Sequence, residues 1–316
     1  VIIAAGLRPN TALAREAGLE TGATGALKVN RAMQTSDPDI YAGGDCVESI
    51  HLVTGAPCYL PLGSTANKHG RVIADNICGV GSNFPGVQGT FVCKAFEYSV
   101  GSTGLTEAQA KRLGLDAMAF SVCGFDKAHY YPDSQIMALK LVVGNSSRRL
   151  LGLQAVGRGD VARRIDVAAT AIRMKATIDD LAHLDMAYAP PFSSALDVFV
   201  TALNVDGNIR TGVMKPVPAL EVRKLLDEDD DVMILDVRAA NEFRRARIDD
   251  PRVINIPLDE LRARMGEVPR DKKVLCLCLL GLRGFSAQRM LEASGFSDVH
   301  TVEGGMFLWP WKDEFA

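Results

Sequence analysis

The sequence predicts a chain of mixed α/β and α+β folds, arranged as three successive parts with one linker. Residues 217–316 alternate apolar runs with helical patterns, which is typical of an α/β domain with a parallel sheet. Residues 87–205 contain paired apolar runs and a periodic helix, which predict an α+β domain. Residues 1–86 show short apolar runs, turns and one helix, which predict part of an α/β domain. Residues 206–216 are rich in glycine, end on a proline and indicate a linker.

The composition is that of an ordinary globular protein. The 316 residues are 47% hydrophobic and 23% charged with a net charge of −3, which gives no reason to expect a nucleic-acid partner. No run of about 18 apolar residues predicts a membrane span. The seven cysteines are odd in number and lack zinc-like spacing. We therefore expect a reducing compartment, with the cytoplasm as the default, and no metal site.

The chain opens with "VIIAAG", a continuous apolar run of the kind found in strands buried on both faces. Such a strand needs neighbours, which normally flank it in sequence. We therefore expect residues 1–86 to be the C-terminal part of a larger domain. Within them, "GALKVN" and "DIYAGGD" predict short strands, and "GSTANKHGRVIADNICG" predicts a helix.

The middle part contains two predicted hairpins and two predicted helices. "GTFVCKAFEYSVGSTGL" predicts one hairpin, and "MALKLVVG" with "LLGLQAVG" predicts the other. "TEAQAKRLG" predicts a helix with Thr106 as its N-cap. In "ARRIDVAATAIRM", the residues Ile165, Ala168, Ala169 and Ile172 recur at helical spacing.

Four apolar runs predict the strands of the last part: "VMILDVR", "VINIPL", "VLCLCL" and "DVHTVEGG". Cys278 lies near the end of the third run and heads a glycine-containing loop that ends at Arg283. Two interpretations are open, because this thiol could be a nucleophile held by backbone amides or a buried core cysteine. Cys276 lies inside the apolar run and is interpreted as a core residue.

A glycine pair ends the run "TSDPDIYAGGDC", where it would let the backbone approach a ligand closely. Asp45 follows directly, so its carboxylate could accept a hydrogen bond from a hydroxyl group of such a ligand. Together with "GLRPN" upstream, this stretch resembles the second flavin fingerprint of pyridine nucleotide-disulfide oxidoreductases. The resemblance implies that Gly44 and Asp45 bind FAD.

The segment "YLPLGSTANKHGRVIADNICG" is similar to the next piece of that family. The family places this helix start, with its partial positive charge, at the pyrimidine edge of the flavin. The resemblance thus assigns cofactor contacts to Pro61, Leu62, Gly63 and Ala66. A plain amphipathic helix is the alternative, but it would not favour small residues in the leading turn.

Residues 87–205 resemble the family's dimerisation domain, and they imply a homodimer. "FDKAHYYPDS" and "DMAYAPPFSSALD" resemble the branch that reduces coenzyme A disulfides. The resemblance implies that Tyr188 reaches the flavin site of the partner subunit, and that Tyr130 lies by the coenzyme A thiol. Tyr131 is the alternative to Tyr130. For any single tyrosine, a core ring with its hydroxyl satisfied is the competing interpretation.

The last part resembles a rhodanese domain over its whole length. The matching residues are Asp236, Arg238, Glu242, Asn255, Pro257, Cys278, Gly281, Arg283, Gly304, Gly305 and Trp309. The resemblance implies that loop amides, a helix N-terminus and Arg283 stabilise the Cys278 thiolate, which carries sulfane sulfur as a persulfide. Two departures are Ala246 and Arg247 in place of the usual Gly-His pair, and three leucines in the loop.

Together, the three resemblances imply a rhodanese-fused reductase of coenzyme A disulfide, persulfide or polysulfide that uses FAD and NAD(P)H. The sequence contains no G-x-G-x-x-G turn and no complete nicotinamide-binding unit, so we expect this polypeptide alone not to bind FAD tightly. Two alternatives remain: a regulatory, dimerising module with a silent rhodanese domain, or a parent that resembles NADH oxidase.

Overall fold

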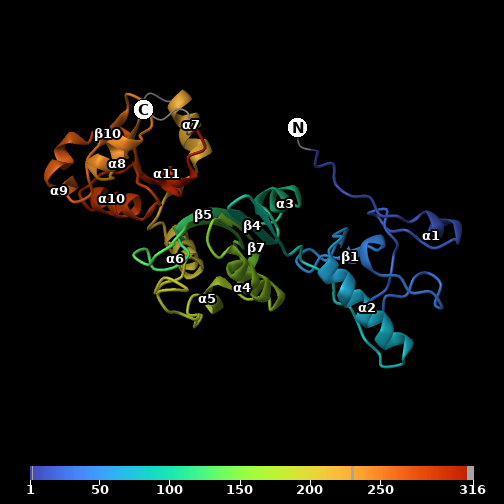
Figure 1. Ribbon diagram of the computed structural model, residues 1–316. Coiled ribbons are helices and arrows are strands. Elements are labelled where there is room, and N and C mark those ends of the chain that lie inside the picture. The colour runs from blue at the N-terminus through green and yellow to red at the C-terminus, as the bar shows by residue number, and fades with distance from the viewer. Residues whose placement is uncertain (2, 229–230, 312–316) are drawn as a thin grey trace. The chain divides into compact units, whose positions relative to one another are not determined.

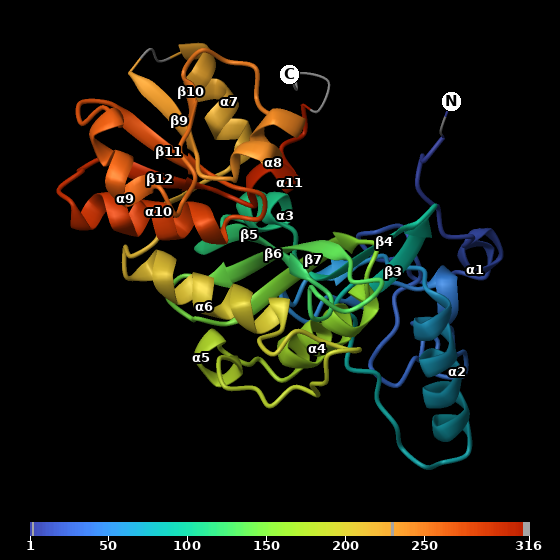
Figure 2. The same ribbon diagram turned by 60° about the vertical axis from the view of Figure 1, so that its left-hand side comes forward.

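The computed structural model describes residues 1, 3–228 and 231–311 (Figure 1). The chain divides into two compact units, Val1–Phe91 and Val92–Ala316, which we describe separately. Figure 2 shows the same elements turned by 60°.

The first unit contains two α-helices and little regular sheet. Its elements are α1 (Ala12–Glu16), the 3-10 helix η1 (Gly44–Cys46), β1 (Ser49–Ile50), β2 (Pro57–Cys58) and α2 (Gly63–Ile77). The predicted helix is confirmed as α2. The predicted strands in "GALKVN" and "DIYAGGD" reduce to single bridges, Leu27 with Val47 and Gln34 with Tyr41. A core that includes Leu27, Met33 and Val72 holds these turns against α2.

The opening strand predicted from "VIIAAG" is not formed by the described residues of that run. Val1 and Ile3 are exposed, and residues 3–10 are irregular; Ile2 lies outside the described residues. The physical reason is that a strand exists only where another strand pairs with its backbone, and a run of apolar residues does not supply that partner.

An antiparallel sheet of order β3-β4-β7-β6-β5 forms the middle part of the second unit. Its elements are β3 (Phe91–Ala95), β4 (Tyr98–Gly104), α3 (Glu107–Arg112), β5 (Ala117–Phe125), β6 (Ile136–Gly144), β7 (Leu150–Gly157), α4 (Val161–Arg173), α5 (Ile178–Leu181) and α6 (Val198–Arg210). Both hairpins and the helices α3 and α4 are as predicted. Thr106 caps α3 in a capping box with Gln109.

Helices α4 and α6 cover one face of this sheet, as both views show (Figures 1 and 2). Ile165 and Ala168 of α4 are fully buried, as their helical spacing predicts. Helix α6 continues to Arg210, into residues that the sequence indicates to be a linker. Asp206 explains the difference, because its buried carboxylate accepts hydrogen bonds from Arg148 and Arg210 and so anchors the last turn.

A parallel sheet of order β10-β9-β11-β12-β8 forms the last part. Its elements are β8 (Pro216–Val217), α7 (Ala219–Glu228), β9 (Val232–Asp236), α8 (Ala240–Arg245), β10 (Val253–Asn255), α9 (Leu261–Arg264), η2 (Met265–Glu267), β11 (Lys273–Leu277), α10 (Leu282–Ala293), β12 (Val299–Val302) and α11 (Gly305–Leu308). The four apolar runs are confirmed as strands.

Helices cover both faces of the parallel sheet. Met233, Leu235 and Cys276 point to the face covered by α9 and α10, and Ile234 and Leu275 point to the face covered by α7 and α11. This alternation is the period-2 geometry of strands, and it explains why these strands are apolar without interruption.

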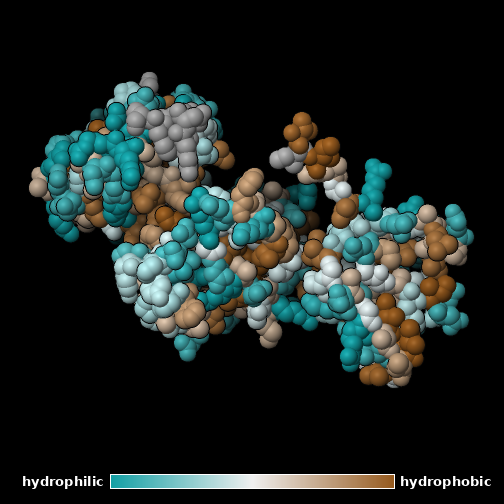
Figure 3. All heavy atoms as spheres, viewed as in Figure 1, coloured by the Kyte–Doolittle hydropathy of each residue, from teal (hydrophilic) through white to brown (hydrophobic). Residues whose placement is uncertain are grey.

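Figure 3 shows hydrophobic side chains on the surface near the end of α2, where Ile77 and Val80 are exposed. Within the described part of the chain, none of the helices has the length and apolar character needed to cross a membrane.

Candidate functional site

Cys278 lies at the carboxyl end of β11, immediately before the loop that leads into α10. The strand alternation places its side chain on the same face as Cys276, which is the face that α10 covers. The ends of parallel strands are where loops of α/β folds gather polar groups, and Asp236 ends the neighbouring strand β9. The topology therefore places the thiol at the carboxyl ends of the strands, where binding and catalytic sites of α/β folds usually lie.

The loop of residues 278–281 bends the backbone toward the thiol. The N–H of Gly281 donates a hydrogen bond to Cys278 Sγ over 3.1 Å. Gly281 has φ +105°, a conformation that favours glycine, and it is the N-cap of α10. Cys278 is only 2% exposed, so the thiol lies at the floor of the loop and little of it meets solvent.

Gly305 supports the loop from the start of α11. A Cβ on Gly305 would lie 2.1 Å from the carbonyl oxygen of Cys278, and this carbonyl accepts the N–H of Met306. The close approach requires glycine, which accounts for the "EGG" stretch after β12. The backbone of Cys278 is thus fixed on two sides.

Arg283 lies in the first turn of α10 and forms a bidentate ion pair with Glu242, with N–O distances of 2.6 and 2.8 Å. The hydrogen bonds from Arg283 lower the pKa of the Glu242 carboxyl, and the carboxylate in turn raises the pKa of Arg283. Glu242 also accepts the N–H of Ala239, which ties the pair to α8. The pair fixes the guanidinium beside the loop, and the carboxylate balances its charge.

Cys276 behaves as the sequence predicts for a core residue. It is fully buried, and burial raises the pKa of its thiol. The departure at Ala246 is accommodated by the main chain, because its carbonyl accepts a hydrogen bond from Arg238. Arg238 is buried against Asp236 at the end of β9.

In the first unit, the glycine turn and the start of α2 lie together. Gly44 has φ +77°, and a Cβ placed on it would lie 3.5 Å from Ala66 Cβ. No side chain caps the N-terminus of α2, which begins after Leu62. Asp45 is exposed and Pro61 is half-buried. The residues of the first unit that are predicted to contact the flavin therefore occupy one region, with an uncapped helix start that favours negative charge.

His69 supports this turn from α2, and the sequence analysis did not identify it. Its Nδ1 accepts the N–H of Gly44 over 3.1 Å, and its ring meets Phe84 edge-on at 4.3 Å. A Cβ on Gly43 would lie 3.0 Å from His69 Cβ, so the contact needs glycine there. Burial lowers the pKa of His69. These contacts show that the glycine turn is closely packed against α2.

Tyr130 lies in the loop between β5 and β6, and Tyr188 lies in the loop between α5 and α6. Tyr130 is 69% exposed and Tyr188 is 52% exposed, so neither is a core ring. Tyr131 is 37% exposed. A hydrogen bond from Ser194 Oγ to the carbonyl of Lys127 joins the two loops.

Two adjacent arginines of α4 hold the tyrosine loops, and the sequence analysis missed both. Arg164 is fully buried, with its guanidinium 2.6 Å from Asp197 Oδ2 and 2.7 Å from the carbonyl of Asp126. Arg163 donates to two carbonyls on either side of Tyr188. A signal was available for Arg164, because it falls on the apolar face of α4.

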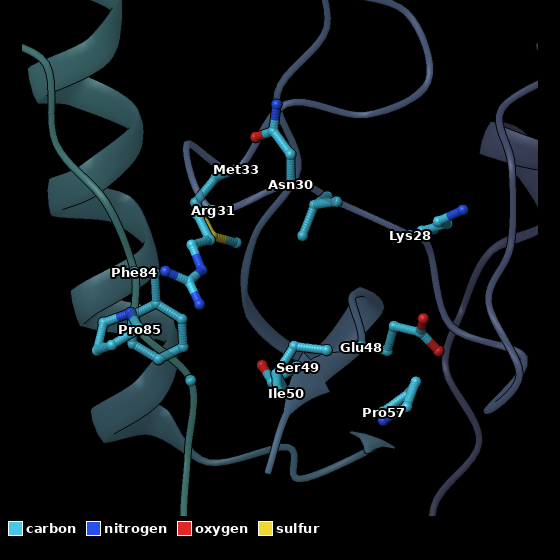
Figure 4. A pocket seen from close by; sticks show the side chains of 12 residues that line it. Lys28, Asn30, Arg31, Met33, Glu48, Ser49, Ile50, Pro57, Phe84 and Pro85 are labelled. Carbon is cyan, nitrogen blue, oxygen red and sulfur yellow. The ribbon is translucent and has the colours of Figure 1, made fainter. Parts of the chain in front are cut away.

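One pocket lies beside Tyr188, and a smaller one lies in the first unit. An open pocket of about 410 Å³ lies at the α5–α6 loop, and Tyr188, Ser193 and Asp197 line it. A smaller pocket of about 180 Å³ lies in the first unit, where Figure 4 shows Arg31 beside Phe84 across from Glu48. The residues that we expect to contact the flavin do not line the smaller pocket.

Comparison with known families matches all three parts. Residues 1–57 match the pyridine nucleotide-disulphide oxidoreductase family, and residues 90–199 match the dimerisation domain of that family. Residues 218–310 match the rhodanese-like domain. The family resemblances and the predicted α/β and α+β fold classes are confirmed.

Individual relatives agree with this assignment. The chain is 42% identical over 205 residues to the CoA-dependent NAD(P)H sulfur oxidoreductase of Pyrococcus furiosus, covering 65% of this chain and 46% of the relative. Among solved structures, an NAD-dependent persulfide reductase from A. fulgidus is 47% identical with a TM-score of 0.90, over 96% of this chain and 54% of that one. The reduced CoADR-RHD of Bacillus anthracis is 40% identical with a TM-score of 0.87, over 97% and 54%. The chain spans about half the length of these relatives.

Proposed function

We propose that this chain, which joins segments of a pyridine nucleotide-disulphide oxidoreductase to a rhodanese-like domain, is part of an enzyme that reduces coenzyme A disulfide, persulfide or polysulfide. The observation that carries the proposal is the hydrogen bond from Gly281 N–H to Cys278 Sγ, in a chain that also has the oxidoreductase dimerisation domain. Relatives named NADH oxidase also match, at 39% identity or less, but the relatives at 42% and 47% identity are named as a sulfur oxidoreductase and a persulfide reductase, which supports this reading over a parent resembling NADH oxidase.

In the sulfur step, the Cys278 thiolate attacks the outer sulfur of a persulfide. A bond forms between Sγ and that sulfur, the S–S bond of the donor breaks, and the donor leaves as a thiolate with the electron pair. The proton of the transferred sulfur passes to this leaving thiolate, so that one negative charge remains, on the Cys278 persulfide. The N–H of Gly281 and the positive charge of Arg283 stabilise the negative charge that is left on the Cys278 persulfide. The leucines at positions 279, 280 and 282 favour a large or apolar donor over thiosulfate.

FAD and NAD(P)H would supply the two electrons of the reductase reaction in the complete protein. From this chain, Gly44, Asp45 and the residues at the start of α2 would bind the flavin. The uncapped helix start would stabilise negative charge on its pyrimidine edge.

Tyr188 and Tyr130 would act at the thiol of coenzyme A. A phenol near a leaving thiolate can donate a hydrogen bond or a proton in the transition state. We place Tyr188 at the flavin site of a partner subunit, with residues 87–205 forming a homodimer. All seven cysteines are free thiols, which fits a reducing compartment, and we place the protein in the cytoplasm.

The test is to load the protein with sulfur and to locate the added atom. After incubation with coenzyme A persulfide and digestion with trypsin, mass spectrometry should show one extra sulfur on the peptide of residues 274–283. That peptide contains two cysteines, so a Cys276→Ala variant is needed to assign the atom. The Cys276→Ala protein should still carry sulfur, and the Cys278→Ser protein should not.

A peptide that gains no sulfur, or that gains it equally in Cys278→Ser, would overturn the proposal. Thiosulfate in place of the persulfide should load the loop more slowly.

A second candidate is a docking or regulatory domain that carries no sulfur. The 2% exposure of Cys278 favours it, because a donor must reach a nearly covered thiol. This candidate predicts that sulfur reduction by the full-length protein is unchanged in Cys278→Ser.

A further inference from the structure

The geometry points to Arg163 as a positioning residue for Tyr188, an inference that rests on the proposed role of that tyrosine. Arg163 lies in the first turn of α4, half-buried, and its guanidinium bridges two points of the α5–α6 loop. One nitrogen donates to the carbonyl of Ala187 over 2.7 Å, and the other donates to the carbonyl of Phe192 over 3.0 Å.

The two bonded carbonyls lie at either end of a short curved segment that contains Tyr188. We call residues 187–193 the arch. Within the arch, the N–H groups of Phe192 and Ser193 both donate to the carbonyl of Ala189, which closes a turn around Pro190 and Pro191. The prolines fix φ within the turn but do not attach it to the domain. Arg163 attaches both ends of the turn to α4, and it therefore determines the position of the Tyr188 phenol.

A guanidinium can make both hydrogen bonds because its two terminal nitrogens lie in one plane and donate in two directions at once. Lysine has a single nitrogen on a flexible stem and could reach one carbonyl at a time. The neighbouring Arg164 performs a different task, since it is buried and joins Asp197 to the carbonyl of Asp126. Arg164 thus holds the base of the loop, and Arg163 holds its tip.

Both tip contacts are made to main-chain carbonyls, which every residue has. The two hydrogen bonds therefore require an arginine at position 163 and a loop of this length. They do not require particular side chains at the other positions of the arch. Tyr188 is half-exposed, so the ring itself has few contacts that could hold it without the arch.

The first experiment measures the arch directly, by hydrogen exchange and by chymotrypsin cleavage after Phe192. In Arg163→Ala, the amides of residues 187–189, 192 and 193 should exchange about tenfold faster or more, and cleavage should accelerate. In Arg163→Lys the change should be smaller. Arg173→Ala, at the exposed far end of the same helix, is the matched control and should behave as the wild type. Unchanged exchange in Arg163→Ala would overturn the inference.

The second experiment combines variants in the full-length enzyme that contains this chain. Turnover of coenzyme A disulfide should fall between about tenfold and about a hundredfold in Arg163→Ala, the range expected when a reacting group is misplaced. In a Tyr188→Phe background, Arg163→Ala should cause no further loss, because the two residues act through one phenol. Additive losses would overturn the inference, since a merely structural role would give them.

The two proposals fail in different ways. If Tyr188→Phe leaves turnover unchanged, the proposed function of Tyr188 is wrong, whatever the exchange data show. If Tyr188→Phe lowers turnover while Arg163→Ala loosens the arch without effect on turnover, the positioning inference alone is wrong.

Discussion

The N–H of Gly281 points at the sulfur of Cys278 over 3.1 Å, and it can do so because Gly281 has φ +105°. An L-residue at this φ is strained by about 1–3 kcal/mol. The hydrogen bond to the thiol and the conformation of one glycine are therefore a single feature, and a substitution at Gly281 tests both.

We expect Gly281→Ala to impair sulfur loading of Cys278. A hydrogen bond to a charged group contributes about 1.5–3 kcal/mol, so the loading rate should fall by about tenfold or more. Gly295→Ala is the matched control, because Gly295 follows α10 at its other end with φ +87°. Space for a Cβ exists at both positions. Stopped-flow loading that slows equally in the two variants would contradict the prediction.

The ion pair of Arg283 and Glu242 should matter more for loading than for stability. Both side chains are about one-third exposed, so the pair should contribute about 1 kcal/mol or less to stability. Glu242→Gln frees Arg283 to leave the loop, and loading should fall several-fold with little change in melting temperature. Glu267→Gln, in the exposed pair with Arg264, is the control. Equal loading in Glu242→Gln and wild type would show that the pair is only structural.

The pair also predicts a pH dependence. Because Arg283 lowers the pKa of Glu242 in the folded state, the stability from this carboxylate is present above its unfolded pKa of 4.5. That stability is lost as the pH falls through the lower, folded value. The difference in unfolding free energy between wild type and Glu242→Gln should be constant from pH 8 to about 5, and it should shrink at lower pH.

The sequence predicted elements whose stability is local or whose pattern is continuous. The strands β9 and β11 are predicted because a strand buried on both faces has an almost continuous run of apolar residues. The capping box of Thr106 was found because its two partners lie three residues apart. The loop of Cys278 is predicted from a thiol, a glycine and an arginine that lie within six residues, and its Gly281 has φ +105°.

Contacts between distant segments could not be predicted in the same way. Arg163 and its partner carbonyls are separated by 24 and 29 residues, and any carbonyl can accept from an arginine, so the sequence holds no matching signal. The link between His69 and Gly44 spans 25 residues and again ends on a main-chain group. The opening run "VIIAAG" failed for a related reason, because hydrophobicity does not identify the strand that must pair with it.

His69 should make the first unit sensitive to acid. Its Nδ1 accepts the N–H of Gly44, so protonation breaks that bond, and burial holds the folded pKa below 6.5. Stability is therefore complete above pH 6.5 and is lost as the pH falls below it, by at most about 1.4 kcal/mol per pH unit. His69→Gln keeps an acceptor but does not titrate. Calorimetry at pH 7.5 and 5.5 should show a smaller acid shift in this variant.

His51 requires a separate control in that experiment. Burial lowers its pKa in the same direction, and its Nδ1 accepts the N–H of Val53. His51→Gln should remove its own share of the acid sensitivity and leave that of His69. An acid shift that is identical in His69→Gln and wild type would contradict the assignment.

The buried pair of Arg164 and Asp197 should be the costliest charge pair to break in the middle domain. Asp197 is buried, accepts hydrogen bonds from Arg164 and Ser193, and caps α6 through the N–H of Phe199. Asp197→Asn leaves the buried guanidinium with only the exposed carboxylate of Asp160, 3.9 Å away, as a counter-charge, which should lower the unfolding free energy by about 3–5 kcal/mol. Asp179→Asn, in the exposed pair with Arg148, should cause no measurable change. Urea unfolding of the two variants decides the matter, because equal midpoints would mean that the burial of Arg164 carries no energetic consequence.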